Sequence, residues 1–245
     1  MKQLFVILIS MLVSTACSPS GKQPEIQAID IISLLEKGEH VFLDSCIIWG
    51  DLDFTVLLNR NKIAANLIRV FVEQSVTFNG CLFTGKVKAF DAQSGVSVAF
   101  AHNVSFIGCD FREEVDFTES TVGGNVFFTG STFRAQASWQ GACFHHKKVY
   151  FSEAHFEDAA LFQGAVFAGE VYFLHTVFGS TAMFQKMRVG GLLFLGNTRF
   201  EGYTDFTYAR ALESIFSYTQ FKGRSDFGYS QLNAGKLPET IRPDM

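Results

Sequence analysis

The sequence predicts an all-β solenoid, a rod of stacked coils in which each coil buries its apolar face against its neighbours. Large apolar side chains recur at alternating steps of five and six residues from Phe106 to Leu232, which gives an eleven-residue period. The residue two before each large side chain is small: 22 of 24 such positions between Val104 and Ser230 hold Ala, Ser, Thr, Val or Cys. Side chains alternate along a strand, so both members of such a pair point to the same side of an extended segment.

A helix does not account for this pattern. Eleven residues return to nearly the same helical face, but the five-residue step turns about 140° away from it at 3.6 residues per turn. The repeats are also rich in Phe, Val, Thr and Gly rather than in strong helix formers. We therefore interpret each repeat as one short strand and one corner.

The pattern is most regular in FSEAHFEDAALFQGAVFAGEVYFLHTVF, from Phe151 to Phe178. This stretch resembles the Phe-rich variant of the pentapeptide-repeat family, whose motif has a large apolar residue at its centre and a small residue two places earlier. The resemblance covers residues 41–232 and implies a right-handed quadrilateral β-helix with one repeat on each side. The six-residue steps depart from the family pattern. We therefore expect about eight coils of about 22 residues, with an extra corner residue on each six-residue side.

The first 16 residues predict a secretory signal peptide. Lys2 precedes an apolar run over Leu4–Val13, which is too short to span a membrane in the mature protein. The run ends in Ser14-Thr15-Ala16-Cys17 and resembles a bacterial lipoprotein signal. That resemblance implies acylation of Cys17, a polar tether over residues 17–24 and attachment to a membrane of the cell envelope. Ser14 stands where such motifs usually have Leu, so ordinary cleavage before Cys17 remains the alternative.

Residues 25–38 predict a short helix that caps the first coil. Apolar residues stand at Ile26, Ile29, Leu34 and Leu35, and Gly38 is placed to end the helix. A cap is expected here because the open end of a sheet must be protected against the addition of further strands.

The polar tail at residues 233–245 makes only a thin cap at the other end, which leaves the last coil available for an end-to-end homodimer.

The coils between these two caps can be aligned by their sequences. Val76–Phe83 repeats as Val104–Phe111, and the 28-residue offset implies an insertion near Asp91–Gly95. Asp44–Phe54 matches one coil earlier and is followed by a longer insertion, Thr55–Gln74.

This alignment predicts one inward column of small residues and a neighbouring column of large ones. The small column is Cys46, Cys81, Cys109, Ser131, Ala154, Thr176, Thr198 and Thr219. The large column includes Phe111, Phe133, Phe156, Phe178, Phe200 and Phe221. Stacked cysteines lie within the Cα separation that a disulfide needs, but small thiols also serve as compact core fillers. We expect free thiols, with a disulfide among Cys46, Cys81 and Cys109 as the alternative.

The sequence contains little that indicates catalysis. It has no Ser/His/Asp signature, no Gly-rich phosphate loop and no CxxC motif, so we expect no catalytic residues and no cofactor. His145-His146-Lys147-Lys148 lies where the repeat takes up one extra residue between two coils. We interpret this segment as a solvated corner rather than a metal or anion site. The net charge of −4 and the absence of a basic stripe argue against binding to nucleic acid.

Two sets of outward residues are candidate binding sites. The first is an aromatic stripe that precedes one large column: Phe127, Tyr150, Tyr172 and Phe194. Exposed apolar stripes mark binding surfaces, although aromatic residues in such a stripe more often only stabilise the sheet by cross-strand contact. The second, weaker candidate is a patch of Asp205, Asp226, Tyr208 and Tyr229 that could hold a cation or a sugar.

These observations favour a non-enzymatic, envelope-anchored scaffold that binds an unidentified protein or glycan. A polysaccharide-active β-helix enzyme is the main alternative, and it requires clustered carboxylates in a groove. An acidic DNA mimic that engages a topoisomerase, as some members of the family do, is a third reading. It requires more negative charge and a cytoplasmic location, which the predicted signal peptide opposes.

Overall fold

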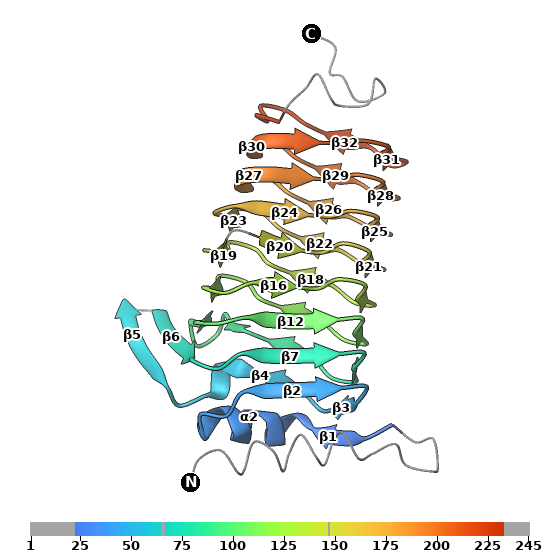
Figure 1. Cartoon of the computed structure of the whole chain (residues 1–245). Helices are drawn as coiled ribbons and strands as arrows, with labels where there is room; N and C mark the ends of the chain where they lie inside the picture. The colour runs from blue at the N-terminus through green and yellow to red at the C-terminus, as the bar shows by residue number, and fades with distance from the viewer. Residues whose placement is uncertain (1–22, 65–66, 147, 233–245) are drawn as a thin grey trace.

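The computed structural model describes residues 23–64, 67–146 and 148–232 as a rod of stacked coils (Figure 1). The predicted signal peptide 1–16, Cys17, most of the tether and the tail 233–245 lie outside the described residues, so their roles remain predictions. The strands of the near face all point to the right as the chain climbs from the N-terminal end, which makes the winding right-handed (Figure 1). Strands on each face pair in parallel with the coil above and below, and form a four-sided prism.

The four sides are called faces I to IV in chain order. Face I consists of β2 (Val41–Asp44), β7 (Val76–Asn79), β12 (Val104–Ile107), β16 (Val126–Phe127), β20 (Lys148–Tyr150), β24 (Glu170–Tyr172) and the ends of β27 (Arg188–Phe194) and β30 (Arg210–Ile215). Face II consists of β1 (Glu25–Gln27), β3 (Ile47–Trp49), β8 (Leu82–Phe83), β13 (Asp110–Phe111), β17 (Thr132–Phe133), β21 (His155–Phe156), β25 (Val177–Phe178), β28 (Arg199–Phe200) and β31 (Gln220–Phe221).

The other two sides are built in the same way. Face III consists of β4 (Leu52–Asp53), β9 (Val87–Lys88), β14 (Val115–Asp116), β18 (Ala137–Ser138), β22 (Ala160–Leu161), β26 (Ala182–Met183), β29 (Thr204–Asp205) and β32 (Ser225–Asp226). Face IV consists of β6 (Leu67–Val72), β11 (Val96–Phe100), β15 (Thr121–Val122), β19 (Cys143–Phe144), β23 (Val166–Phe167) and the starts of β27 and β30. These last two strands therefore turn the corner from face IV to face I.

The predicted register is confirmed. Val104 pairs with Val76 on one side and with Val126 on the other, as the 28-residue and 22-residue offsets require. Ile47 pairs with Leu82, which confirms the alignment of the first coil. The eight strands of face I, from β2 to β30, agree with the expected number of coils.

Large side chains fill the rod as stacked aromatic columns. In the face II column, Phe133 and Phe156 have ring centroids 4.6 Å apart and planes within 5° of parallel. Phe156 and Phe178 are 4.9 Å apart at 2°. These separations equal the spacing of neighbouring strands, so identical side chains in one rotamer stack without adjustment. All but two of the 24 small positions are buried, and the exceptions, Ser225 and Ser230, lie in the last coil.

The five-residue and six-residue steps have different corners. A five-residue step turns through a residue with positive φ, and the amide of the following residue closes the turn: at Glu153 φ is 61°, and Ala154 N donates to Phe151 O at 3.1 Å. That geometry is a type II turn. The six-residue step has the extra corner residue that the sequence predicted. At one such corner Gly223 is required, because a Cβ there would lie 2.2 Å from the carbonyl oxygen of Gly202.

The N-terminal cap differs from the predicted helix over 25–38. The helix α2 spans only Ala28–Glu36, and residues Glu25–Gln27 form β1, which pairs in parallel with β3. A helix over those residues would leave the backbone of β3 without a partner on that side, so strand pairing prevails there. The helix buries Ala28, Ile31, Ile32 and Leu35 against the first coil, whereas Ile29 is 63% exposed.

Both predicted insertions are found. The first forms a 3-10 turn, η1 (Phe54–Val56), and an antiparallel hairpin of β5 (Arg60–Ala64) and β6 (Leu67–Val72). Strand β6 completes face IV of the first coil, while β5 extends away from the rod (Figure 1). The second insertion forms β10 (Phe90–Asp91), which pairs antiparallel with β11.

We expect Ala165→Leu to destabilise the rod severely. Ala165 is fully buried, and its position in the neighbouring coils is occupied by Ala142 and Met187, both also fully buried. Overpacking a close-packed interior costs about 1–3 kcal/mol or more, and a stacked coil cannot shift without its neighbours. Ala168→Leu adds the same atoms on the exposed side of face IV and should be nearly neutral. Equal melting temperatures for the two variants, measured by circular dichroism, would contradict the register.

Candidate functional site

The four residues of the predicted stripe lie side by side on face I and form what is called here the aromatic column: Phe127, Tyr150, Tyr172 and Phe194. They pair in sequence through β16, β20, β24 and β27. All four are partly exposed. The same outward position holds Ser105 in the preceding coil and Ile215 in the following one, so the column stops being aromatic at both ends.

Within the column the rings stack face to face. Phe127 and Tyr150 have centroids 5.2 Å apart and planes within 2°, and Tyr150 and Tyr172 are 5.0 Å apart at 10°. Phe194 breaks the stack, because its ring meets Tyr172 edge-on at 71° and 6.1 Å. The ring lies over Gly196, where a Cβ would come within 2.9 Å of Phe194 Cζ. Most π faces are therefore covered by the next ring, and the ring edges face the solvent.

Two charged residues lie beside the column: Lys148, which the sequence predicted to be part of a solvated corner, and Glu170, which it did not single out. Lys148 and Glu170 pair directly on β20 and β24, with Lys148 Nζ 3.5 Å from Glu170 Oε2. The hydroxyl of Tyr172 donates to the same carboxylate oxygen, and Lys148 Nζ lies 5.9 Å from the centre of the Tyr172 ring. The hydrogen bond to Glu170 raises the pKa of Tyr172 to about 12 and lowers the pKa of Glu170. Each of them lies two residues before an aromatic residue of the column and therefore on the same side of the strand. This spacing is the sequence signal that could have identified them.

The Asp205 patch is brought together but is already hydrogen-bonded. Asp205 pairs with Asp226, and the rings of Tyr208 and Tyr229 stack at 5.0 Å. Asp205 as a residue is only 5% exposed. It accepts from Gln185 Nε2 at 2.5 Å, from the Tyr203 hydroxyl at 3.2 Å and from Thr207 N at 2.8 Å.

The Asp carboxylates at this outward position of face III each accept a hydrogen bond that closes a turn. Asp226 accepts from Gly228 N at 2.8 Å, and Asp116 accepts from Thr118 N at 2.9 Å in the same manner. Each carboxylate thus bonds to the amide two residues ahead and fixes the next corner, as Asp side chains commonly do at turns. Turn capping therefore explains why acids occur at this outward position. The sequence had suggested Asp205 and Asp226 as part of a patch that could hold a cation or a sugar.

The cysteine column consists of buried free thiols. Cys46, Cys81 and Cys109 are at most 1% exposed and are not cross-linked. Hydrogen bonding to Cys109 raises the pKa of Cys81 to about 11, and hydrogen bonding to Cys81 raises the pKa of Cys46 above its usual value. A raised pKa disfavours the reactive thiolate, so the column acts as core packing.

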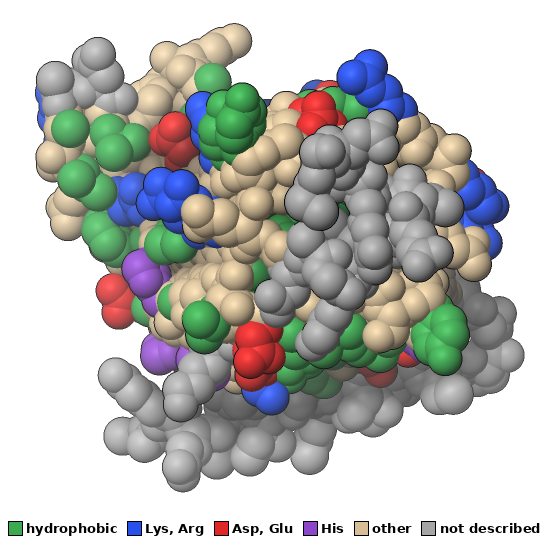
Figure 2. All heavy atoms as spheres, turned by 90° about the horizontal axis from the view of Figure 1, so that it is seen from above, with side chains coloured by type: hydrophobic (Ala, Val, Ile, Leu, Met, Phe, Trp, Pro, Cys, Tyr) green, Lys and Arg blue, Asp and Glu red, His purple; other side chains and the backbone are tan. Residues whose placement is uncertain are grey.

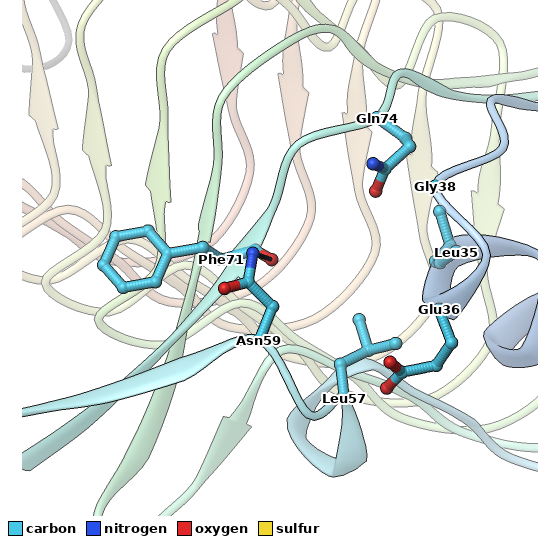
Figure 3. Close-up of a pocket in the computed structure, with 7 residues that line it drawn as sticks. All are labelled: Leu35, Glu36, Gly38, Leu57, Asn59, Phe71 and Gln74. Atoms are coloured by element: carbon cyan, nitrogen blue, oxygen red, sulfur yellow. Dashed lines mark hydrogen bonds between the residues drawn. The ribbon is translucent and has the colours of Figure 1, made fainter.

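Two hollows occur at the N-terminal end of the rod. The smaller, of about 140 Å³, lies between α2 and the start of the hairpin and is lined by Leu35, Glu36, Gly38, Leu57, Asn59, Phe71 and Gln74 (Figure 3). Glu36 Oε1 accepts from Leu58 N at 2.6 Å and so joins the helix to the hairpin, while Asn59 Nδ2 donates to Phe71 O at 3.0 Å within the hairpin. The larger hollow, of about 320 Å³, lies on face IV over Ala99, Ala101, Thr121 and Gly123. Its floor consists of small side chains, and Arg69 and Glu73 are among the residues around it.

Within residues 23–64, 67–146 and 148–232, no three His, Cys, Asp or Glu side chains are grouped so that they could hold a metal ion. His145 lies at the edge of the larger hollow. No helix of the described chain is long and apolar enough to cross a membrane.

Residues 151–196 match the family model described as pentapeptide repeats (9 copies). The matched residues include parts of all four faces. Tyr172 and Phe194 of the aromatic column lie inside the match, and Tyr150 directly precedes it. No curated protein and no solved structure gave a match to the chain.

Proposed function

We propose that this pentapeptide-repeat protein is a non-enzymatic scaffold at the bacterial cell envelope that presents face I to a partner protein. The fold supports a rigid rod: neighbouring coils are joined on every side by backbone hydrogen bonds, such as Val177 N to Ala154 O at 2.9 Å. The predicted signal peptide and Cys17 support attachment to a membrane through a lipid anchor.

The observation that carries the proposal is the aromatic column. It places four partly exposed aromatic side chains in one line on a flat sheet surface. Tyr and other aromatic residues are enriched at protein interfaces, where they contribute large contact areas. Glu170 and Lys148 beside the column add polar groups that can fix the orientation of a partner.

A protein suits this surface better than a glycan. Sugars stack on the faces of aromatic rings, but Tyr150 lies between Phe127 and Tyr172, so both of its faces are covered. The ring edges and the Tyr150 hydroxyl remain available, while the Tyr172 hydroxyl donates to Glu170. Edges are the positive rim of an aromatic ring, and carbonyl oxygens or other aromatic side chains of a protein can pack against them.

The alternatives receive less support. A polysaccharide-active enzyme needs acids that are free to transfer protons, and Asp205 accepts three hydrogen bonds from its own chain. A DNA mimic needs an unbroken acidic surface. On face II the acids pair with basic residues instead: Arg134 bonds to Asp110 at 2.8 Å and to Glu157 at 3.2 Å.

We expect the double variant Tyr150→Ser and Tyr172→Ser to lose partner binding. The partner is first captured from solubilised envelopes with the wild-type chain, and the dissociation constants of both chains are then measured. Loss of the interface anchors should weaken binding at least tenfold, or about 1.4 kcal/mol. Unchanged binding would contradict the proposal. Tyr150→Phe with Tyr172→Phe keeps the stack and should retain most of the affinity.

A further inference from the structure

The hairpin at the N-terminal end of the rod carries basic residues and no acidic ones. It is called here the basic hairpin and comprises residues 56–64 and 67–69, from the end of η1 into β6. Arg60, Lys62 and Arg69 all lie in it, and no Asp or Glu occurs between Asp53 and Glu73. The whole chain has a net charge of −4. Arg60 and Lys62 are exposed. Arg69 is partly buried, and its Nη1 donates to Thr121 Oγ1.

The basic hairpin also exposes large apolar side chains. Leu58 is 77% exposed, Ile63 54% and Val56 48%. Along the described coils from β7 to β28, Ile107 is the one large apolar side chain that is comparably exposed. Seen along the rod, the projecting corner carries hydrophobic and basic side chains next to each other (Figure 2). Apolar side chains that remain in water beside positive charges indicate a surface with a partner.

The structure holds these side chains outward. Arg60 Nε donates to Leu57 O at 2.8 Å and Arg60 Nη2 to Thr55 O at 3.1 Å, which ties η1 to β5. Leu58 N donates to Glu36 Oε1, which ties the same segment to the cap helix. Pairing of Arg60 with Val70 and of Lys62 with Ile68 fixes β5 against β6. Leu58 and Lys62 are thus displayed on an ordered support.

The location of the basic hairpin points to a lipid surface. Its start lies beside the cap helix, where Leu58 N donates to Glu36 Oε1, and β5 rises from there away from the rod (Figure 1). Pro24 is the seventh residue after Cys17, a stretch that reaches at most about 25 Å, so a lipid on Cys17 would keep this end of the rod close to the bilayer. Basic residues beside exposed apolar ones are the composition that binds anionic membrane surfaces.

We propose that the basic hairpin is a second membrane contact, which binds an anionic bilayer and fixes the orientation of the rod. The proposal rests on the lipid anchor of the proposed function. Basic residues on β5 also guard its open edge against pairing with another strand, since β5 ends the sheet. Edge protection explains Lys62 but gives no reason for exposed Leu58 and Ile63.

The test measures contact between the hairpin and lipid in the full, lipidated chain. Vesicles contain brominated phosphatidylcholine and roughly a third anionic phosphatidylglycerol, and bromine quenches tryptophan fluorescence at close range. Both reporter variants also carry Trp49→Phe, so that the one remaining native tryptophan is Trp139, which is fully buried and away from the quencher. Leu58→Trp reports on the hairpin, and Tyr218→Trp reports on an 83% exposed position at the far end.

Quenching of Leu58→Trp without quenching of Tyr218→Trp is the expected result. Absence of quenching in Leu58→Trp would overturn the proposal and favour an acidic protein as the partner of the hairpin. Equal quenching at both positions would also overturn it, because the rod would then lie flat on the membrane. Sedimentation with uncharged phosphatidylcholine vesicles tests the lipid anchor separately, so failure of the anchor is distinguishable from failure of the hairpin contact.

Charge reversal provides the second measurement. Lys62→Glu, added to the Leu58→Trp variant, replaces a positive charge with a negative one and so changes the charge near the lipid surface by two. The ratio of membrane-bound to free hairpin, measured by quenching, should fall by about tenfold or more. Lys186→Glu makes the same change at an exposed corner of the rod, a type of corner that holds Glu119 and Glu153 elsewhere. Equal effects of the two variants would overturn the role of charge in this contact.

Discussion

Replacing Phe156 by Ala should destabilise the rod by about 3–5 kcal/mol, the usual cost of removing a fully buried phenyl ring. Phe156 is 1% exposed and lies in the middle of the face II column, with Phe133 and Phe178 stacked above and below it at 4.6 Å and 4.9 Å. Each of those rings would lose a face contact. The cavity cannot collapse easily, because backbone pairing fixes the separation of the coils.

Two further Phe→Ala variants make the test specific. Phe221→Ala removes the last ring of the same column, which stacks on Phe200 at 4.7 Å and is partly exposed, so its cost should be smaller. Phe42→Ala removes a side chain that is 62% exposed on β2 and should change stability by less than about 0.5 kcal/mol. Unfolding in urea, followed by circular dichroism, should rank the three variants in that order. A similar loss in all three would contradict the stacked-column account.

The second large effect concerns localisation. Cys17→Ala should release the chain from the membrane or leave its signal peptide uncleaved, because the acylated thiol would be absent. Two or three acyl chains hold a protein firmly on a bilayer, whereas one chain gives only reversible binding. The measurements are fractionation of the envelope and incorporation of radiolabelled palmitate.

Cys143→Ala is the matched control for this prediction. Cys143 is a free thiol on β19, partly buried on face IV, and its removal should leave labelling and fractionation unchanged. Membrane association that is retained in Cys17→Ala together with normal processing would show that Cys17 is not the anchor. The basic hairpin alone would then have to account for any residual binding to anionic lipid.

The sequence predicted the interior of the rod well because burial imposes a repeating constraint. Each coil places its side chains directly above those of the previous coil, so an inward column must have similar sizes throughout. The column from Cys46 to Thr219 and the stack from Phe111 to Phe221 could therefore be aligned by their sequences, even across the two insertions. The aromatic column was found in the same way, from its position one residue before an inward one.

The corners and the surface were less predictable. Positive φ occurs at Glu153, Lys186 and Tyr208, although these residue types rarely adopt it, and no local signal marks those positions. The conformation is imposed by the strands on both sides of the turn. Likewise, residues 25–27 form a strand because β3 offers an unpaired edge, which is a property of the first coil and not of those three residues.

By itself, the sequence determined the class of fold, the register of the coils and the identity of the residues in the core, because alternation along a strand and stacking at a fixed spacing both leave a period in the chain. Only the tertiary structure decided how the outward side chains meet. The rings of Phe127 and Tyr150 cover each other's faces, Asp205 is used to fix a turn, and the basic hairpin projects from the rod. These arrangements depend on neighbours that lie one or more coils away in the chain, and a linear period does not record them.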